Sequence, residues 1–373
     1  MSPAGAADAA SPPSAASPAG PASPAGTVGH LGIDVGGTKV ALRLVPVGGA
    51  PREASFRWSA GVPAETDLRD LGAGVAALLG EWGGRLAGVG VAMPATVDPS
   101  GRVTAWPSRP SWTGLDLGQA VRELAAGAPV ALGDDGDLAA LAEADHAGSA
   151  NLVYVGVGTG IGGGIVLDGR LCPGTARGSC EIGHLIVALD GPRCRCGRDG
   201  CLQALASGPA TLRRATELRA TARPGASDEP GASDEPAAAA EVTHPELREA
   251  WVEGAGWARA AVGTTARAIA GALVGLTELV RPDLAVVGGG FADGLPGLVD
   301  AITVQAQAMA RPGHPPVPVR AAALGGLSSL AGAVILARHA DEGRGDGRDL
   351  DRERRTDHLG LDLDPARSVL RTG

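Results

Sequence analysis

One histidine and three cysteines lie close together near the middle of the chain. The imidazole is His184, and the thiols are Cys194, Cys196 and Cys201, with the spacing C-x-C-x4-C. In a reducing compartment, cysteines clustered this tightly favour a metal site over a disulfide. One imidazole and three thiolates form a closed tetrahedral set, which is typical of structural zinc. The segment therefore predicts a structural Zn²⁺ site held by these four side chains.

Two glycine-rich turns have residue types suited to binding phosphate. They are Asp34-Val-Gly-Gly-Thr38-Lys39 and Gly158-Thr-Gly-Ile-Gly-Gly-Gly164. Glycine lets backbone N–H groups approach an anion without a Cβ in the way. Each turn alone is also compatible with an ordinary hairpin. A strand-like stretch follows each turn and the Walker Gly-Lys-Ser/Thr pattern is absent, which disfavours Rossmann and P-loop sites.

An acidic turn runs from Gly133 to Asp137 and reads Gly-Asp-Asp-Gly-Asp. It enters an Ala/Leu-rich helix expected from Asp137 to His146. Carboxylates at this place suit the positive end of a helix, so helix capping is one interpretation. The other is catalysis, because a carboxylate in reach of an alcohol can act as the general base of phosphoryl transfer.

The elements that must position these groups alternate between strands and helices. A β-hairpin is expected around each glycine turn, from residues 29–34 with 40–45 and from residues 152–157 with 164–167. Further strands are expected at 86–92, 129–132 and 284–287, and helices at 67–79, 117–126, 246–280 and up to about 340. This order predicts an α/β protein.

Composition and charge narrow the classes of function. The chain has 373 residues and a formal charge of −9, which disfavours a broad nucleic-acid-binding surface. Six Trp, two Phe and one Tyr leave a core expected to consist mostly of Ala, Val, Leu and Ile. The first 29 residues carry no Lys or Arg and no continuous apolar run. We therefore expect no secretory signal, no transmembrane helix and a cytoplasmic location.

Three segments lack the apolar periodicity of packed elements. Residues 1–27, rich in Ala, Pro and Ser, are expected to be disordered. Residues 222–240 are expected to form a low-complexity loop with a tandem Gly-Ala-Ser-Asp-Glu-Pro repeat, and residues 341–373 a flexible charged tail.

The two hairpins, the acidic turn and a third glycine cluster at Gly288–Gly290 together resemble the actin/hexokinase-type (ribonuclease H-like) ATPase fold. Glu181-Ile-Gly-His184, followed by the cysteine cluster and Leu202-Gln203, resembles the zinc motif of the ROK family of sugar kinases and repressors. The resemblance covers about residues 28–340. It implies a small lobe of about 28–132, joined by the C-terminal helix of about 326–340, and a large lobe of about 133–325 that holds the zinc.

The resemblance also implies roles for individual residues. The family motif Glu-Asn-Asp-Ala-Asn aligns with residues 133–137 and places Asp135 at the catalytic aspartate, the general base. The implied cofactors are Mg²⁺ with ATP and structural Zn²⁺, and Asp34 would hold magnesium through water. The residues expected to bind ATP are Asp34, Gly36, Gly37, Thr38, Lys39, Gly158, Thr159, Gly160, Gly162, Gly288, Gly289 and Gly290.

The expected sugar-binding residues depart in part from the family pattern. Glu181 and His184 match family residues that hydrogen-bond sugar hydroxyls. By contrast, Asp134, Gln203 and Ser108 stand where the family has Asn, Glu and Asn. A site built to hydrogen-bond hydroxyls rejects ligands that leave its polar groups unpaired. The changes therefore argue against plain glucose.

We expect an ATP-dependent kinase that phosphorylates the exocyclic hydroxymethyl of a hexose-like polyol. The favoured substrate is a seven-carbon cyclitol, a valiolone- or valienone-like pseudo-sugar of antibiotic biosynthesis, with glucose or an amino sugar as alternatives. A non-catalytic ROK-type sugar sensor is a further alternative, although no basic recognition helix precedes the first hairpin. The implied partners are ATP and the polyol, without nucleic acid or membrane, and a homodimer is the family-level expectation.

Overall fold

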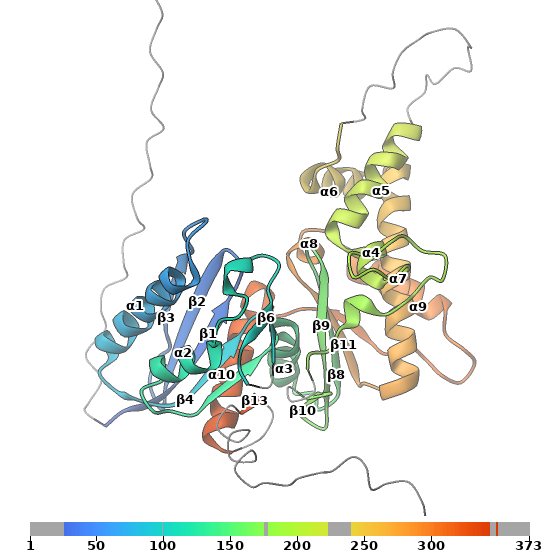
Figure 1. Ribbon diagram of the computed structural model, residues 1–373. Coiled ribbons are helices and arrows are strands. Elements are labelled where there is room, and N and C mark those ends of the chain that lie inside the picture. The colour runs from blue at the N-terminus through green and yellow to red at the C-terminus, as the bar shows by residue number, and fades with distance from the viewer. Residues whose placement is uncertain (1–25, 99, 175–177, 223–239, 344–347, 350–373) are drawn as a thin grey trace, which may run out of the picture.

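The computed structural model describes residues 26–98, 100–174, 178–222, 240–343 and 348–349. In this part of the chain two α/β lobes lie side by side, each built on its own sheet (Figure 1). This architecture confirms the two-lobed α/β fold expected from the sequence. The expected lobe boundaries near residues 132 and 325 stay predictions.

The small lobe is built on a six-stranded sheet. Its strands are β1 (Val28–Val35), β2 (Lys39–Pro46), β3 (Arg52–Arg57), β4 (Arg85–Ala92), β7 (Val130–Gly133) and β13 (Arg348–Asp349). Their order is β13-β7-β4-β1-β2-β3. β1 and β2 pair antiparallel up to Val35 opposite Val40, which confirms the first hairpin. In β2 buried residues alternate with more exposed ones, as expected of a strand with one face on the core.

The rest of the small lobe covers this sheet. It consists of the two-stranded ribbon β5 (Thr96–Val97) and β6 (Val103–Ala105), α1 (Ala64–Trp82), the 3₁₀ turn Pro110–Trp112 and α2 (Leu117–Leu124). Trp82 and Trp112 are among the largest fully buried side chains, beside Leu, Ile and Val. The core is aliphatic as expected, but it also holds tryptophans that the composition alone did not place.

The large lobe is built on a five-stranded sheet of order β10-β9-β8-β11-β12. The strands are β8 (Leu152–Val157), β9 (Ile161–Leu167), β10 (Arg170–Cys172), β11 (Leu284–Gly288) and β12 (Val319–Ala321). β8 and β9 pair antiparallel up to Val157 opposite Ile161, which confirms the second hairpin. In each lobe, a glycine-rich turn therefore joins the two strands of the sheet that come first along the chain.

Helices cover the outer face of the large-lobe sheet (Figure 1). They are α4 (Leu202–Ala206), α5 (Gly208–Thr221), α6 (His244–Glu253), α7 (Gly256–Val280), α8 (Gly290–Asp293) and α9 (Leu298–Ala308). The helices expected over 246–280 are α6 and α7, and Gly254 ends α6 in the left-handed conformation at φ 79°. α7 is long and apolar enough to cross a membrane, but half of its most apolar window is buried, and it packs between α5 and α9.

Two helices, α3 (Asp135–Ala147) and α10 (Ser328–Asp341), lie between the two sheets. α10 approaches β4 so closely that a Cβ on Gly90 would lie 2.0 Å from the carbonyl oxygen of Ala333. The buried carboxylate of Glu143 in α3 accepts hydrogen bonds from Leu324 N–H at 3.0 Å and Ser328 Oγ at 2.9 Å. These contacts fix α3 to the start of α10 and so set the position of the α3 N-terminus between the lobes.

Helix α3 begins two residues before the expected start at Asp137. The reason is that Asp134 is the N-cap residue, and its Oδ1 accepts a hydrogen bond from Gly136 N–H at 3.0 Å. The capping role considered for Asp135 therefore belongs to its neighbour, and Asp135 is the first residue of the helix.

The three segments expected to lack packed structure fall largely outside the described residues. These are residues 1–25 of the N-terminal segment, residues 223–239 around the hexapeptide repeat, and residues 344–347 and 350–373 of the expected tail. Within the expected tail, Arg348 and Asp349 pair with β7 as the edge strand β13.

Candidate active site

A cavity of about 880 Å³, called the large cavity below, opens between the lobes. Asp135 and Gly136 at the start of α3 line it, as do residues 156–162 around the second glycine turn. The small lobe contributes Trp106 to Ser108. The expected general base therefore shares one cavity with the second expected phosphate-binding turn.

The N-terminus of α3 reaches this cavity because glycines face glycines there. A Cβ on Gly136 would lie 2.6 Å from the backbone nitrogen of Gly163 in β9, and a Cβ on Gly164 would lie 2.7 Å from the Cα of Asp137. Side chains at these positions would push the helix away from the strand. The glycines of β9 thus serve packing as well as the turn, and they bring the acidic residues against the turn.

Burial and mutual repulsion raise the pKa values of the carboxyl groups at this helix start. Desolvation raises the pKa of Asp135, and the nearby charge of Asp34 adds to it. Desolvation, followed by the charges of Asp135 and Asp137, raises the pKa of Asp134 to about 8. Desolvation also raises the pKa of Asp137 to about 7. Carboxyl groups with raised pKa values are suited to exchanging a proton near neutral pH.

The first glycine turn packs on the cavity wall from the small lobe, although none of residues 34–39 is among those that line the large cavity. Trp58 Nε1–H donates a hydrogen bond to the carbonyl of Gly36 at 2.8 Å and holds the turn against the tryptophan cluster. A Cβ on Gly37 would lie 2.6 Å from Ser108 Oγ, so the turn packs directly on a residue of the cavity wall. Lys39 is exposed at the start of β2.

Asp34 and Thr38 frame that turn. Ser329 Oγ–H, in α10, donates a hydrogen bond to Asp34 Oδ2 at 2.8 Å, and Ser329 itself lines the large cavity. Burial raises the pKa of Asp34, against the lowering effects of this hydrogen bond and of Lys39. The Thr38 carbonyl accepts from Trp58 N–H at 3.2 Å. Asp34 and Asp135 therefore face one another closely enough to repel, which is a suitable environment for a divalent cation.

The second and third glycine clusters lie together at the large-lobe side. Gly158 N–H donates to the Gly160 carbonyl at 2.9 Å and closes the second turn, in which Thr159 and Gly162 also line the cavity. Gly289 has φ 94°, and a Cβ there would lie 2.7 Å from Val157 N, so only glycine fits. Gly289 lines the cavity, whereas Gly288 packs against Ala322 and Gly290 starts α8.

A second cavity of about 340 Å³, called the acidic cavity below, lies on the other side of the α3 N-terminus and shares Pro94 with the large cavity. Asp134, Asp137 and Glu181 line it, and no Lys, Arg or His is among its described lining residues. Asp137 Oδ1 accepts a hydrogen bond from Cys180 N–H at 3.4 Å, and Ser179 Oγ–H donates to Glu181 Oε1 at 3.0 Å. Three carboxyl groups thus share a small space whose described lining includes no cationic side chain.

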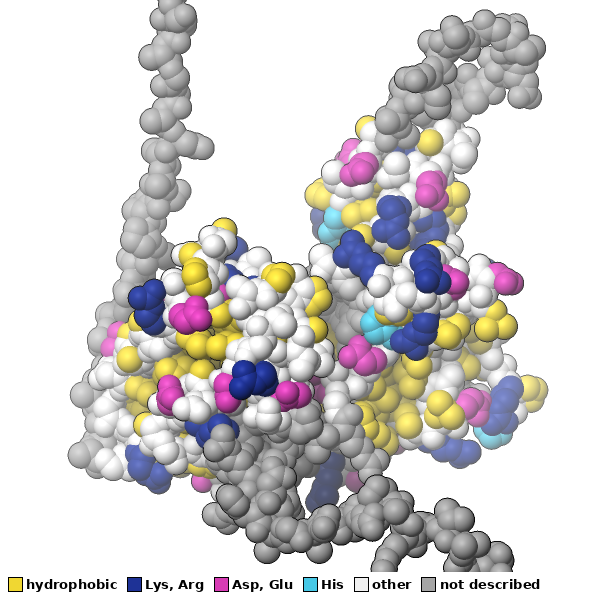
Figure 2. Space-filling view, viewed as in Figure 1, with side chains coloured by type: hydrophobic (Ala, Val, Ile, Leu, Met, Phe, Trp, Pro, Cys, Tyr) yellow, Lys and Arg dark blue, Asp and Glu magenta, His cyan; other side chains and the backbone are white. Residues whose placement is uncertain are grey.

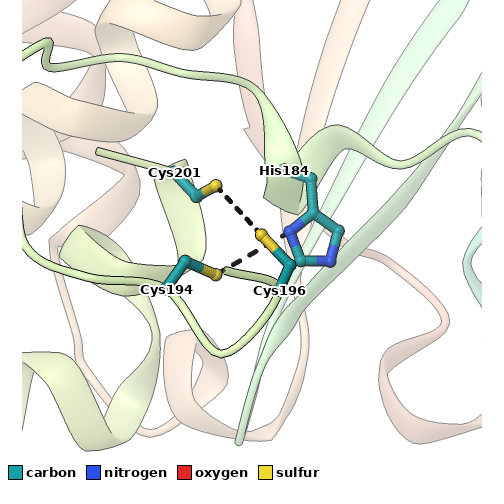
Figure 3. Close-up of side chains that lie close together, drawn as sticks. All are labelled: His184, Cys194, Cys196 and Cys201. Atoms are coloured by element: carbon teal, nitrogen blue, oxygen red, sulfur yellow. Dashed lines mark hydrogen bonds between the residues drawn. The ribbon is translucent and has the colours of Figure 1, made fainter. Parts of the chain in front are cut away.

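The histidine and the three cysteines converge as the sequence predicts (Figure 3). Their ligand atoms all lie within 4.8 Å of one another, with His184 Nδ1 3.8 Å from Cys194 Sγ and Cys196 Sγ 3.6 Å from Cys201 Sγ. This donor set and spacing fit tetrahedral Zn²⁺, which would cross-link the loop before α4. The other ring nitrogen, His184 Nε2, lies 4.0 Å from Glu181 Oε2, so the same imidazole would connect the metal to the acidic cavity.

The structure divides the five expected sugar-binding residues among three places. Asp134 and Glu181 line the acidic cavity, Ser108 and Gln203 line the large cavity, and His184 belongs to the Cys3His cluster. The side-chain amide of Gln203 donates to Cys194 Sγ at 3.3 Å. This hydrogen bond ties Gln203 to residues 184–201, which carry the Cys3His cluster and are called the zinc loop below. The two cavities share Pro94, and the adjacent residues Asp134 and Asp135 line one cavity each.

The sequence analysis did not single out two groups of residues that line the cavities. The first is Asp137, which lines the acidic cavity and stands where the family motif ends in Asn. The alignment with that motif, which singled out Asp134, could have singled out Asp137 as well. Arg193, Arg195 and Arg213 also line the large cavity, and nothing in their spacing indicated it.

The fold and the paired cavities are those of an ATP-dependent sugar kinase, and comparisons with known proteins agree. The ROK family matches residues 30–340. Kanosamine kinase of Amycolatopsis mediterranei is 52% identical over 308 residues, covering 83% of this chain and 95% of that protein. Glucokinase of Streptomyces coelicolor is 29% identical over 328 residues, covering 83% and 98%.

Solved structures resemble this fold over most of its length. A ROK hexokinase from Thermus thermophilus superposes with a TM-score of 0.71 at 29% identity, covering 84% of this chain and 99% of that one. A ROK glucokinase from Streptomyces griseus, solved with glucose and AMPPNP, gives a TM-score of 0.65 at 29% identity, covering 83% and 99%. This chain belongs to the ROK family, as its zinc motif predicted.

Proposed function

We propose that this kinase transfers the γ-phosphoryl group of ATP to the exocyclic hydroxymethyl of an amino sugar. The observation that carries the proposal is the acidic cavity, which is lined by Asp134, Asp137 and Glu181 and by no described Lys, Arg or His. A protonated amine on the substrate would supply the missing positive charge. The amino-sugar alternative is therefore preferred here to the seven-carbon cyclitol, which stays a prediction.

Carboxylates bind an ammonium group more strongly than a hydroxyl, and of the three here Asp137 is buried whereas Glu181 is exposed. Hydrogen bonds to charged groups contribute roughly 1.5–3 kcal/mol, about twice those between neutral groups. Repulsion among the three carboxylates favours the same ligand, because an ammonium relieves it and a hydroxyl does not. The 52% identity to a protein named kanosamine kinase supports an amine-bearing hexose in particular.

In the proposed mechanism Asp135 takes the proton of the acceptor hydroxyl while the hydroxyl oxygen attacks the γ-phosphorus. The bond between that phosphorus and the bridging oxygen of ADP breaks, and ADP leaves with the bonding electrons. Backbone N–H groups of the glycine turns orient the phosphates. Mg²⁺ bound with ATP neutralises charge on the phosphates, and Asp34 is the carboxylate that would hold it.

The zinc site is structural in this proposal. The four ligands leave no open position for a substrate, and the metal would fix the loop that carries Gln203 and the His184–Glu181 contact. The homodimer and the cytoplasmic location expected from the sequence remain predictions.

A substrate panel with ATP and Mg²⁺ tests the proposal. Glucose, its amino derivatives with the amine at different carbons, and a seven-carbon cyclitol would be compared by kcat/KM with the full chain. We expect an amino sugar to exceed the matched neutral sugar by about 10- to 100-fold, the factor that one charged hydrogen bond contributes. A neutral cyclitol or glucose with an equal or higher kcat/KM would contradict the amino-sugar proposal, and ATP turnover with none of them would favour a non-catalytic sensor.

A further inference from the structure

The large cavity has the opposite charge pattern to the acidic cavity. The charged groups among its described lining residues are Asp135 and three arginines, Arg193, Arg195 and Arg213. The protein as a whole carries a formal charge of −9, so cations gathered in one cavity run against the average surface. Arg side chains gather on the large lobe over α5 and the loop before α4, beside the gap between the lobes (Figure 2).

These arginines come from two separate elements. Arg193 and Arg195 flank the zinc-site residue Cys194, and Arg213 lies in α5. Because Arg195 stands between the ligands Cys194 and Cys196, the cluster restricts its backbone. The loop and α5 therefore present guanidinium groups to the cavity that also contains the second glycine turn.

The arginines differ in whether another residue of this chain already forms an ion pair or hydrogen bond with them. Arg193 Nη1 pairs with Asp199 Oδ1 at 3.3 Å, across the bridge between these two residues in the zinc loop. Arg214, next to Arg213, donates to the Ala261 carbonyl at 3.2 Å and so packs into the lobe. Arg195 and Arg213 are exposed, and no carboxylate among the described residues lies within 4.0 Å of either.

We propose that Arg195 and Arg213 bind the phosphate chain of the nucleotide. Guanidinium groups bind phosphate oxygens through paired, charge-assisted hydrogen bonds. The backbone N–H groups of the second glycine turn and these two side chains then hold the phosphates from two directions. The zinc loop would thereby contribute directly to nucleotide affinity, in addition to fixing the sugar-binding residues.

This inference rests on the proposed use of ATP, and it names the residues that would recognise the phosphates. The nucleotide phosphates are favoured over the phosphate of a sugar product because the arginines share their cavity with Gly289 and the second glycine turn, whereas the carboxylates occupy the acidic cavity. An anion would be repelled from the acidic cavity.

Calorimetric titration of the full, zinc-loaded chain with ATP, ADP, AMP and adenosine tests the inference. We expect Arg195→Ala and Arg213→Ala each to weaken ATP and ADP binding about tenfold, to weaken AMP binding less, and to leave adenosine binding unchanged. Arg195→Lys should recover part of the affinity for ATP. Zinc content and Tm, measured for every variant, identify any that fail to fold.

Two control variants separate phosphate binding from damage to the fold. Arg248→Ala changes an exposed arginine of α6, and Arg259→Ala changes an exposed arginine of α7; neither residue lines the cavity. Both should keep ATP affinity near that of the unchanged chain. Unchanged ATP binding in Arg195→Ala and Arg213→Ala, or equal losses for ATP and adenosine, would overturn the inference. Failure of the unchanged chain to bind ATP would instead overturn the proposed donor.

Discussion

The two cavities beside the α3 N-terminus differ in charge although consecutive residues line them. Asp134 lines the acidic cavity with two further carboxylates, and Asp135 lines the large cavity with three arginines. One helix start therefore serves both, since its first residues point to opposite sides. The difference shows that consecutive residues of a single acidic turn can line two cavities whose other charged groups differ in sign.

The largest expected effect comes from removing the base between the cavities. Asp135→Asn should lower kcat about 10²- to 10⁴-fold, because proton transfer in the transition state is lost while the shape of the site is kept. ATP binding and zinc content should stay near those of the unchanged chain. Steady-state kinetics with the best amino sugar measure the effect, and a variant that retains more than a tenth of the activity would remove Asp135 from the role of base.

The next effect tests the acidic cavity alone. Asp134→Asn keeps the helix cap in kind but removes a carboxyl group that can ionise beside a bound ammonium, so kcat/KM for an amino sugar should fall about 10- to 100-fold. The value for the matched neutral sugar should stay level or rise. Equal losses for the two sugars would show that Asp134 serves folding or general positioning, and the paired cavities would then have no role in selecting an ammonium.

Zinc removal should affect both cavities, because the zinc loop supplies residues that line the large cavity and a residue, His184, that contacts Glu181 of the acidic cavity. Cys201→Ser should lower zinc content and raise the KM for ATP and for the sugar about tenfold each, consistent with the cost of disturbing groups around a metal. Arg195 is expected to lose its place in the large cavity, and Glu181 its contact with His184. Metal analysis together with the two KM values checks this, and a rise in only one KM would assign the loop to one cavity.

The smallest expected effect is on stability. Because burial raises the pKa of Asp134 to about 8 in the folded protein, above about 3.9 in the unfolded chain, its contribution is fully present below pH 4. It is lost as pH rises through about 8. Asp134→Asn should therefore leave Tm unchanged near pH 4 and raise it above pH 8, by about 2 °C for each 1 kcal/mol relieved. A Tm difference independent of pH would contradict the burial of a charged group.

Much of the fold followed from local pattern. The alternating apolar residues of β2 and the glycines between Val35 and Val40 were enough to predict the first hairpin, since a two-residue period defines a strand face. The zinc loop was predicted for a similar reason, because its ligands His184 and Cys194–Cys201 lie close in sequence. Helices were expected over residues 246–280, but the position of the break between α6 and α7 was not, because a glycine within a helical pattern gives no sign of its φ.

By itself, the sequence determined the chemistry available to this protein: the family, the Cys3His cluster, the glycine-rich turns and a carboxylate at position 135. Only the tertiary structure decided which groups share a cavity. Arg195 and Arg213 are separated in the chain and become neighbours of one cavity through the packing of the zinc loop near α5, while Asp134 and Asp135 are adjacent in the chain and line different cavities. Charge and hydrogen-bonding type are properties of single residues, whereas the direction in which a side chain points depends on the elements packed around it.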